Sequence, residues 1–436
     1  MDKRQEAIEI FLAGVESVKP DNLIKRYISI NNNILQIEKI VFELISVKNI
    51  YVVGAGKASA AMAQTMESIL GSRITAGHII TKYGHSVPLK FIKTTEAGHP
   101  IPDENGVYGT NQILLIVNQA DKDDLVICLI SGGGSALLAD VPDECTLEDL
   151  KFVNNILLKT GANITEMNCI RKHLSKVKGG LLAKAASPAR VISLILSDVI
   201  GDPLDVIASG PTAPDPTTFA DAISIIRNYK IENEIPKQIY RVLQEGFEKK
   251  RQETLKDTDD ILFRTNNLII GTNLLALNTA KEKAESLGYE SQIMTSELAG
   301  DVVVVSNYIV DIVKIIKKEK TNKKCLLFAG EPTVKVKGTG SGGRNQHLAL
   351  LIAKLLEDLP GITILSGGTD GTDGPTDAAG AVVDSFTAKN ASNLFLNMEK
   401  YINNCDSYHF FKQEGGLIIT GPTQTNVMDL IIALID

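Results

Sequence analysis

Three aspartates set among closely spaced glycines distinguish the stretch from Ser366 to Gly380. An apolar run at 362–365, typical of a buried strand, leads into Asp370, Asp373 and Asp377. Glycine lets a backbone turn tightly and approach a ligand, and carboxylates beside hydroxyls are the oxygen ligands that a hard cation such as Mg²⁺ prefers. A flexible linker would rarely place three carboxylates so regularly. We therefore predict a site for a phosphate and its metal, with Asp370 as the metal ligand and the other two aspartates shaping the turn.

A second glycine-rich stretch follows the very apolar run at 125–130. Successive glycine N–H groups at the start of a helix form a cradle for an anion, and such loops lie where open parallel sheets bind their ligands. A turn that binds nothing is the alternative. We favour phosphate binding, and we assign it to Ser131, Gly132, Gly133, Gly134 and Ser135.

A glycine turn at 54–57 places Lys57 at the start of another helix. The turn is not a Walker A loop, because Tyr51 stands where the first glycine of that motif belongs. It is also an incomplete dinucleotide fingerprint, since Ser59 replaces the third glycine and no acidic residue ends the next predicted strand. From these residues alone, a plain strand-to-helix turn explains the pattern equally well. A cation at a helix N-terminus nevertheless favours a nearby anion, and we include Gly56 and Lys57 in the candidate site.

A cationic run from Arg171 to Lys178 stands out in an acidic chain and ends beside two glycines. Binding of an anionic substrate by these two residues competes with the simpler explanation of a solvated basic helix face. Asp198 follows the apolar run at 190–196. A carboxylate at a strand end suits metal binding or general-base work, and helix capping is the alternative role.

A single arginine follows a third glycine-rich loop, which ends at Gly343. The planar guanidinium of Arg344 is suited to phosphate oxygens, and phosphoryl transfer needs positive charge of this kind. We add Gly343 and Arg344 to the candidate site. The sequence has no HExxH or GxSxG motif, so zinc proteolysis and the usual serine hydrolase chemistry are unsupported.

The composition narrows the classes of partner. The chain has 436 residues, a net charge of −7 and no tryptophan, which argues against nucleic-acid and anionic-membrane partners. Its five cysteines are scattered without CxxC spacing, which suits a reducing cytoplasm and gives no support to structural zinc. No apolar run is long enough to span a bilayer, and the first residues predict a charged amphipathic helix rather than a signal peptide. We therefore expect a cytoplasmic protein with a small-molecule substrate, and we leave a homodimer open.

Strands that alternate with helices must position these residues, which predicts parallel sheets covered on both faces. We predict two three-layer α/β domains, because the chain is too long for one ordinary core. A charged stretch beginning at Glu248 is the expected join, so the predicted boundaries are 1–247, a linker at 248–263, and 264–436. Three local predictions are a helix over 33–46, a β-turn-β unit with strands at 324–329 and 333–337, and a final helix after Gly421.

Taken in order, these stretches resemble the glycerate 2-kinase family, in which a glycerate-kinase N-terminal domain precedes a C-terminal MOFRL domain. The resemblance covers nearly the whole chain. The motifs that carry it are short but ordered: 54–58, 96–104, 131–137, 171–180, 197–198, 207–212, 330–331, 342–346, 366–380 and 421–427.

The resemblance implies ATP-dependent phosphorylation of D-glycerate at its 2-hydroxyl, with Mg²⁺, to give 2-phosphoglycerate. It also implies a larger Rossmann-like parallel-sheet domain and a smaller mixed-sheet domain, with the active site in the cleft between them. By similarity, Lys57 and Arg344 are the principal catalytic cations. From their chemistry, Asp198 and Asp370 are metal ligands, or one of them is the base that removes the hydroxyl proton.

Three departures from the family pattern bear on the site. His347 stands where an acidic residue commonly follows, 201–204 reads Gly-Asp-Pro-Leu in place of Gly-Asp-Asp-Pro, and Ala329 replaces a glycine. They leave the role of position 347 and the metal geometry near Asp202 open. Two other functions are the alternatives: an NAD(P)H-dependent hydroxypyruvate reductase, which the incomplete dinucleotide motif disfavours, and a non-catalytic anion-binding relative.

Overall fold

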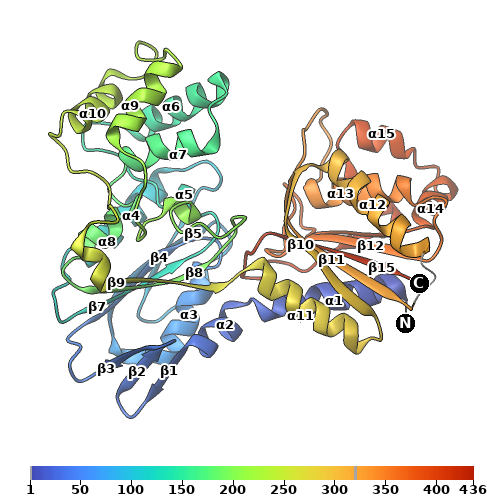
Figure 1. Ribbon diagram of the computed structural model, residues 1–436, viewed down its shortest axis with the longest axis horizontal. Coiled ribbons are helices and arrows are strands. Elements are labelled where there is room, and N and C mark those ends of the chain that lie inside the picture. Colours follow the sequence, from blue (N-terminus) through green and yellow to red (C-terminus); the bar gives the residue numbers. More distant parts are fainter. Residues whose placement is uncertain (1, 319–321) are drawn as a thin grey trace. The chain divides into compact units, whose positions relative to one another are not determined.

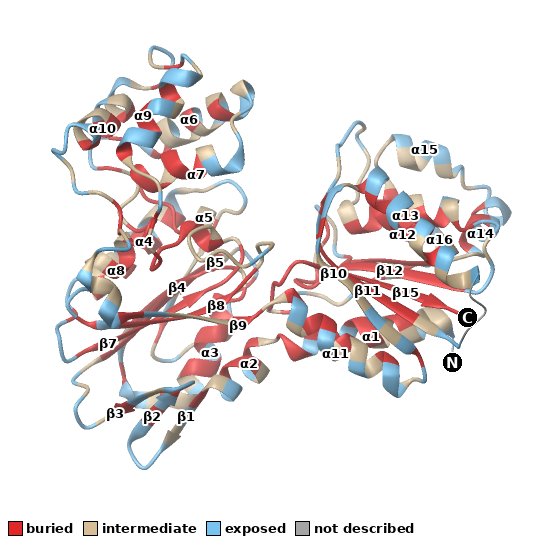
Figure 2. Ribbon diagram, viewed as in Figure 1, coloured by how far each residue is buried: buried red, intermediate tan, exposed pale blue. Residues whose placement is uncertain are grey.

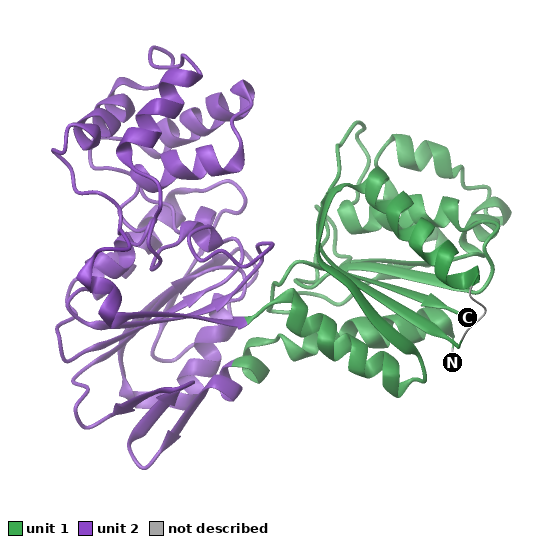
Figure 3. Cartoon of the chain, viewed as in Figure 1, with its two compact units in different colours: residues 1–23, 271–436 green, residues 24–270 purple. Residues whose placement is uncertain are grey.

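The computed structural model describes residues 2–318 and 322–436, which fold as two compact units (Figure 3). Unit 1 combines Met1–Leu23 with Gly271–Asp436, and unit 2 consists of Ile24–Ile270. This division differs from the boundaries expected from the sequence, which were 1–247, 248–263 and 264–436. The first helix, α1 (Lys3–Ser17), packs with the C-terminal residues, where its Phe11 ring lies against Gly367.

The charged stretch at 248–263 is part of unit 2 because its backbone is bonded into that unit. Leu255 is fully buried, and its N–H donates to the carbonyl of Gly179 at 2.8 Å. Its own carbonyl accepts the N–H of Asp215 at 2.7 Å. Exposed neighbours such as Asp257 give the stretch the composition of a linker, although its centre is core.

A six-stranded sheet forms the centre of unit 2, in the order β6-β5-β4-β7-β8-β9 (Figure 1). Strands β4 to β8 pair in parallel. Every residue of β4 and β7 is buried, because α3 covers one face and α4 and α8 cover the other. The strands are β4 (Ile50–Ala55), β5 (Ile74–Lys82), β6 (Lys93–Ala97), β7 (Leu125–Ile130), β8 (Arg190–Leu196) and β9 (Thr265–Gly271).

Four helices of unit 2 form a separate layer above the sheet, with a buried cluster of their own that includes Leu157, Ile170 and Ile223 (Figure 1). They are α6 (Leu147–Thr160), α7 (Ile164–His173), α9 (Phe219–Asn228) and α10 (Lys237–Phe247). The other helices of the unit are α2 (Pro20–Tyr27), which begins in unit 1, α3 (Ser59–Leu70), α4 (Glu104–Val117), α5 (Gly134–Leu137) and α8 (Leu181–Ala186).

A small antiparallel sheet replaces the helix predicted over 33–46, so that prediction is wrong. It consists of β1 (Ile28–Asn31), β2 (Ile34–Ile37) and β3 (Ile40–Glu43). Asn32 and Asn33 turn the chain with φ of 49° and 65°, the left-handed backbone that a two-residue hairpin turn requires. The side chains of Leu35 and Ile37 alternate with exposed ones along β2, which is the period of a strand.

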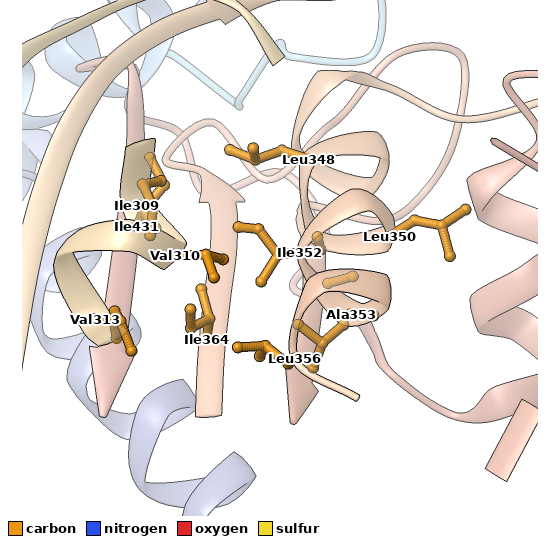
Figure 4. Close-up of a cluster of buried hydrophobic side chains, with 14 of the residues drawn as sticks. Ile309, Val310, Val313, Leu348, Leu350, Ile352, Ala353, Leu356, Ile364 and Ile431 are labelled. Atoms are coloured by element: carbon orange, nitrogen blue, oxygen red, sulfur yellow. The ribbon is translucent and has the colours of Figure 1, made fainter. Parts of the chain in front are cut away.

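Unit 1 is built on a mixed six-stranded sheet in the order β10-β11-β15-β12-β13-β14. Strands β10 and β11 are parallel, and the other pairs are antiparallel. Helices α1 and α11 cover one face, while α12 and α13 cover the other (Figure 1). Val310 of α12 and Ile352 of α13 meet Ile364 and Ile431 of the sheet in a closely packed aliphatic core (Figure 4).

Two local predictions in unit 1 are wrong. Strand β15 (Asp429–Ile435) occupies the place of the predicted final helix. All seven of its residues are buried between β11 and β12, so its apolar run has no alternation that would identify a strand. Strand β11 (Lys324–Thr333) runs straight through Gly330, so the β-turn-β unit with a second strand at 333–337 does not form.

The remaining elements of unit 1 are β10 (Glu290–Asp301), β12 (Ile362–Gly368), β13 (Gly380–Asp384), β14 (Leu417–Ile418), α11 (Asn273–Ser286), α12 (Val302–Lys318), α13 (Arg344–Leu355), α14 (Thr387–Asn393), α15 (Met398–Asn403) and α16 (Ser407–Glu414). The expected fold class, two α/β domains with a parallel and a mixed sheet, is confirmed. Buried residues are concentrated in the strands and in the helix faces turned toward them (Figure 2). Within the described ranges, no helix is both long enough and apolar enough to cross a membrane.

Candidate active site

Three neighbouring strands of unit 2 end at one edge of its sheet, and a predicted site residue follows each of them. The registers pair Ala55 of β4 with Ile130 of β7, and Ile130 with Ile195 of β8. Because the strands are parallel, their carboxyl ends meet at the edge where α/β sheets bind ligands. Lys57, the loop at 131–135 and Asp198 all follow these ends.

The loop at 131–135 lies directly against Lys57. The backbone N–H of Lys57 donates to the carbonyl of Gly132 at 2.9 Å. Gly133 has a φ of 81°, and a Cβ placed on it would lie 2.9 Å from Cδ2 of His99 and 3.5 Å from Cγ of Lys57. The side chains of Lys57 and His99 therefore flank this glycine, and a larger residue would collide with the histidine ring. In the described part of the chain, no acceptor is bonded to the N–H groups of Gly132 and Gly133.

Other members of the predicted cradle hold the loop together. Ser131 is fully buried, and its hydroxyl accepts the N–H of Ala58 at 3.0 Å. A Cβ on Gly56 would lie 2.0 Å from that hydroxyl, so glycine is required for the β4 turn to approach the loop. Gly134 packs against Ala208, and the hydroxyl of Ser135 lies 2.7 Å from that of Ser209. Phosphate binding by these residues stays a prediction.

A cavity of about 220 Å³ opens beside this loop, entirely within unit 2. Gly133, Ser135, Arg171 and Lys178 all line it, so the structure brings the predicted cationic run to the predicted anion cradle. Nε of Arg171 donates to Oδ1 of Asn154 at 2.8 Å, and burial lowers the pKa of Arg171 below its usual value. Lys178 is differently placed, because its ammonium donates to the carbonyl of Leu138 and lies 3.2 Å from Oδ1 of Asp140.

Arg344 begins helix α13 in unit 1, and two carboxylates hold its guanidinium. Nε and Nη2 bond the two oxygens of Asp429 at 2.6 and 3.0 Å, and Nη1 bonds Oε1 of Glu331 at 2.6 Å. Burial would lower the pKa of Arg344, but attraction to Asp429 and Glu331 raises it above its ordinary value, so the charge is permanent. These bonds use three of the five N–H groups and leave one on each terminal nitrogen to face a ligand.

Asp373 fixes the start of α13. Its carboxylate accepts the N–H groups of Asn345 and Gln346 at 3.1 and 2.8 Å, as a helix-capping residue does. Burial raises the pKa of Asp373 to about 6, although these N–H groups act to lower it. A Cβ on Gly343 would lie 2.2 Å from the same carboxylate. Gly343 and Asp373 therefore set the position from which Arg344 projects.

The remaining aspartates of the loop after β12 differ from each other. Asp370 is buried, and its Oδ1 accepts the N–H and the hydroxyl of Thr372 at 3.0 and 3.2 Å. Asp377 is exposed. Within the described residues, no three His, Cys, Asp or Glu side chains group to hold a metal by themselves. Mg²⁺ commonly binds one or two carboxylates together with substrate phosphates, so a metal role for Asp370 of unit 1 and for the half-buried Asp198 of unit 2 stays a prediction.

Four residues of these clusters had no role assigned from the sequence: Asp429, Glu331, His99 and Asn154. Three of them lie in or beside stretches that carried the family resemblance. The sequence therefore marked their neighbourhood, but it did not indicate what these side chains do. The fourth, Asn154, is an ordinary residue of α6. His347 is buried, its Nδ1 has no hydrogen-bond partner in the described part of the chain, and burial lowers its pKa.

Comparison with known proteins points to one family. Residues 6–244 match the family described as "Domain of unknown function (DUF4147)", and residues 324–429 match the MOFRL family. The chain is 41% identical over 433 residues to the D-glycerate 2-kinase of Thermotoga maritima, covering 98% of this chain and 97% of that one. It is 39% identical to a putative hydroxypyruvate reductase of Agrobacterium vitis, covering 88% of this chain and 86% of that one. The crystal structure of the Thermotoga maritima glycerate kinase matches with a TM-score of 0.86 at 40% identity, over 99% of both chains.

The chain thus belongs to a class of protein that combines a DUF4147 domain, here built on a parallel sheet, with a MOFRL domain, here built on a mixed sheet. Within that class, the chain belongs to the glycerate 2-kinase family.

Proposed function

We propose that the chain is a glycerate 2-kinase, which transfers the γ-phosphoryl group of ATP to the 2-hydroxyl of D-glycerate. The observation that carries the proposal is the contact between Lys57 and the glycine loop at 131–135, in a chain of this family. An ammonium beside glycine N–H groups at a sheet edge is suited to the phosphates of a nucleotide. Hydroxypyruvate reduction, the alternative enzymatic activity, does not use this arrangement as directly.

The proposed reaction forms a bond between the 2-oxygen of glycerate and the γ-phosphorus. The bond from that phosphorus to the bridging oxygen of ADP breaks, and ADP leaves with the electron pair. Lys57 and Arg344 stabilise the negative charge that spreads over the phosphoryl oxygens. A carboxylate, Asp198 or Asp370, takes the proton of the hydroxyl. Asp198 or Asp370, together with the phosphates, would hold Mg²⁺, which would supply positive charge to the leaving group.

A direct assay tests the proposal. The purified chain is incubated with D-glycerate, ATP and Mg²⁺, and the products are separated so that 2-phosphoglycerate is distinguished from 3-phosphoglycerate. Formation of 2-phosphoglycerate with equimolar ADP is expected. Formation of the 3-isomer, or ATP hydrolysis that does not depend on glycerate, would overturn it. Omission of Mg²⁺, with a chelator present, is expected to abolish turnover.

The name of the Agrobacterium vitis relative makes hydroxypyruvate reduction the second candidate. The residues of this chain do not support it, because Gly54 and Gly56 pack against β7 and its loop: a Cβ on Gly54 would lie 2.0 Å from the carbonyl oxygen of Leu129. In a dinucleotide fold, these glycines would instead let the backbone approach a pyrophosphate. Oxidation of NAD(P)H by hydroxypyruvate in the absence of ATP would establish the reductase and refute the kinase.

Two further expectations accompany the proposal. The cytoplasm is the proposed location, on the basis of the scattered cysteines, none of which is in a disulfide in the described structure. Self-association into a homodimer stays a prediction, which the mass of the purified protein in solution would test.

A further inference from the structure

The cavity of about 220 Å³ in unit 2 has two chemically different sides. One side is aliphatic, and successive turns of two helices supply it. Leu147, Leu150 and Val153 recur every three residues along α6, which places them on one face. Ile170 of α7 and Leu174, the residue directly after α7, continue the same surface.

The other side of the cavity is the glycine loop. Gly133, Ser135 and Ala136 line it, and Pro100 and Pro102 close it from the chain beyond β6. Gly133 also contacts Lys57, so the cavity adjoins the cradle proposed for phosphates. A ligand that fills the cavity would therefore have one end at that cradle.

The polar side chains of the cavity are His99, Ser135, Asp140, Asn154, Arg171 and Lys178, and two of them, Asp140 and Lys178, pair with each other at 3.2 Å. Arg171 is bonded to the amide oxygens of Asn154 and Asn168, at 2.8 and 3.4 Å, and to no carboxylate among the described residues. Asn154 accepts through Oδ1, and its amide nitrogen donates to no group in the described part of the chain. A cationic plane and an amide edge thus lie beside the aliphatic helix side of the cavity, in addition to the Lys178–Asp140 ion pair. Guanidinium groups stack on aromatic rings, and asparagine amides pair with the edge of adenine.

We propose that this cavity is the nucleoside site, which holds the adenine and ribose of ATP between α6, α7 and the loop at 131–135. The proposal rests on the proposed kinase function and adds to it the place where the donor nucleotide binds. Glycerate carries a polar group on each of its three carbons and would leave the aliphatic side unmatched. Adenine has two apolar faces and a polar edge, which match the aliphatic helix surface and the Asn154 amide. The triphosphate then extends past Gly133 toward Lys57.

The substitution Ala136→Leu tests the site by narrowing the cavity at its loop side. The KM for ATP is expected to rise at least about tenfold. The added carbons of leucine would push the bound nucleoside out of position, and a misfit of this size costs about that much affinity in a closed pocket. The KM for glycerate and kcat at saturating ATP should change less than twofold. Leu150→Ala, which widens the cavity on the opposite side, is expected to raise the KM for ATP by a few-fold without altering that for glycerate.

Two controls separate base recognition from phosphate recognition and from folding. Ala220→Leu makes the same change at an exposed position of α9 outside the cavity and should leave both KM values unchanged. Inorganic tripolyphosphate, which has no nucleoside, should inhibit the wild type and Ala136→Leu with the same inhibition constant. Adenosine, which has no phosphate, should compete with ATP in the wild type and lose potency in Ala136→Leu.

Distinct results would contradict the site and the function. A rise in the KM for glycerate, with that for ATP unchanged, would make the cavity the acceptor site. Unchanged values for both substrates, in variants whose melting temperatures match the wild type, would remove the cavity from the reaction. If the wild type phosphorylates no glycerate, the proposed function fails. Calorimetric titration of ADP into wild type and Ala136→Leu would still test the site in that case, since equal affinity would refute it.

Discussion

Asp429 receives two parallel hydrogen bonds from Arg344, through Nε at 2.6 Å and Nη2 at 3.0 Å. Asp429 is the first residue of β15 and is almost completely buried, whereas the side chain of Arg344 is one third exposed. The strand therefore holds the arginine by a geometry that a lysine could not reproduce. We therefore propose Asp429 as a positioning residue that acts through Arg344.

Asp429→Asn is expected to lower kcat by about 10- to 100-fold, because a small displacement of a charge-stabilising group is costly at the transition state. The KM for ATP should change much less, which distinguishes lost positioning from a damaged nucleotide site. Arg344→Lys should show the same loss of kcat, because a lysine ammonium cannot reproduce the two parallel bonds to Asp429. Steady-state kinetics on folded variants measure both. Activity near the wild-type level in Asp429→Asn would remove Asp429 from the machinery.

Lys57→Met should reduce kcat by about two to three orders of magnitude, since a charge aimed at the transferring group is lost. Its side chain is half-buried, and the methionine preserves its length, so the melting temperature should change little. Lys48→Met at an exposed position of the same unit is the matched control and should retain full activity. Turnover within tenfold of the wild type would refute the catalytic role of Lys57.

Arg344→Ala is expected to affect stability as well as activity. It leaves the buried carboxylate of Asp429 without its partner, which costs about 3–5 kcal/mol in a fully buried pair and less here, because the Arg344 side chain is one third exposed. The double variant Arg344→Ala with Asp429→Ala should recover part of that loss, because the stranded charge is gone. Urea denaturation followed by circular dichroism measures the difference. Equal stability of the single and double variants would contradict the buried pair.

Asp373→Asn should destabilise unit 1 by about 1–3 kcal/mol, because the amide presents only one acceptor to the N–H groups at the start of α13. Asp377→Asn, at an exposed position of the same loop, is the control and should be neutral. Loss of the cap should also lower kcat, since α13 begins at Arg344. Denaturation profiles and turnover that both match the wild type would count against this account.

The pair of His173 and Glu253 should make unit 2 less stable at alkaline pH. Burial would lower the pKa of His173, but its bonds to the Cys169 carbonyl and to Glu253 raise it to about 9. The unfolded value is about 6.5, so the stabilisation by the imidazolium is fully present below pH 6.5 and is lost as pH rises through 9. The free energy of unfolding should fall over this window, by at most about 3 kcal/mol.

Thermal unfolding between pH 6 and 10 measures this dependence. His173→Gln is expected to be less stable than the wild type at pH 6 and to converge with it near pH 10. A wild-type profile that is flat over this range, or one with the same slope in His173→Gln, would show that the imidazole is neutral in the folded state.

The sequence predicted most of unit 2 because its strands carry long apolar runs followed by glycine loops. β7 and the loop at 131–135 are the clearest case. The hairpin at Asn32 and Asn33 was not predicted, because 33–46 was expected to be helical, although both turn residues adopt the left-handed backbone that a hairpin turn requires. β15 could not be identified by period at all, because both of its faces are buried.

The structure shows which of the predicted site residues lie together, and their roles in a reaction stay predictions. Lys57 and the glycine loop share a sheet edge, which follows from parallel strands. The two hydrogen bonds between Arg344 and Asp429 could not be predicted, because they depend on which strand lies beside β12. The place of Arg171 on the cavity wall depends likewise on how α7 packs against α6 and the loop. Tertiary packing decides both.

The order of strands in unit 1 has a consequence for biosynthesis. β15 lies between β11 and β12, yet it leaves the ribosome after every other strand of the sheet. α1 is synthesised before every strand of that sheet. Its apolar face, which includes Phe11, can pack only after the sheet has formed. Unit 2, whose residues are contiguous, has no such delay. A nascent chain stalled between β14 and β15 should therefore carry a protease-resistant unit 2 and an unprotected unit 1.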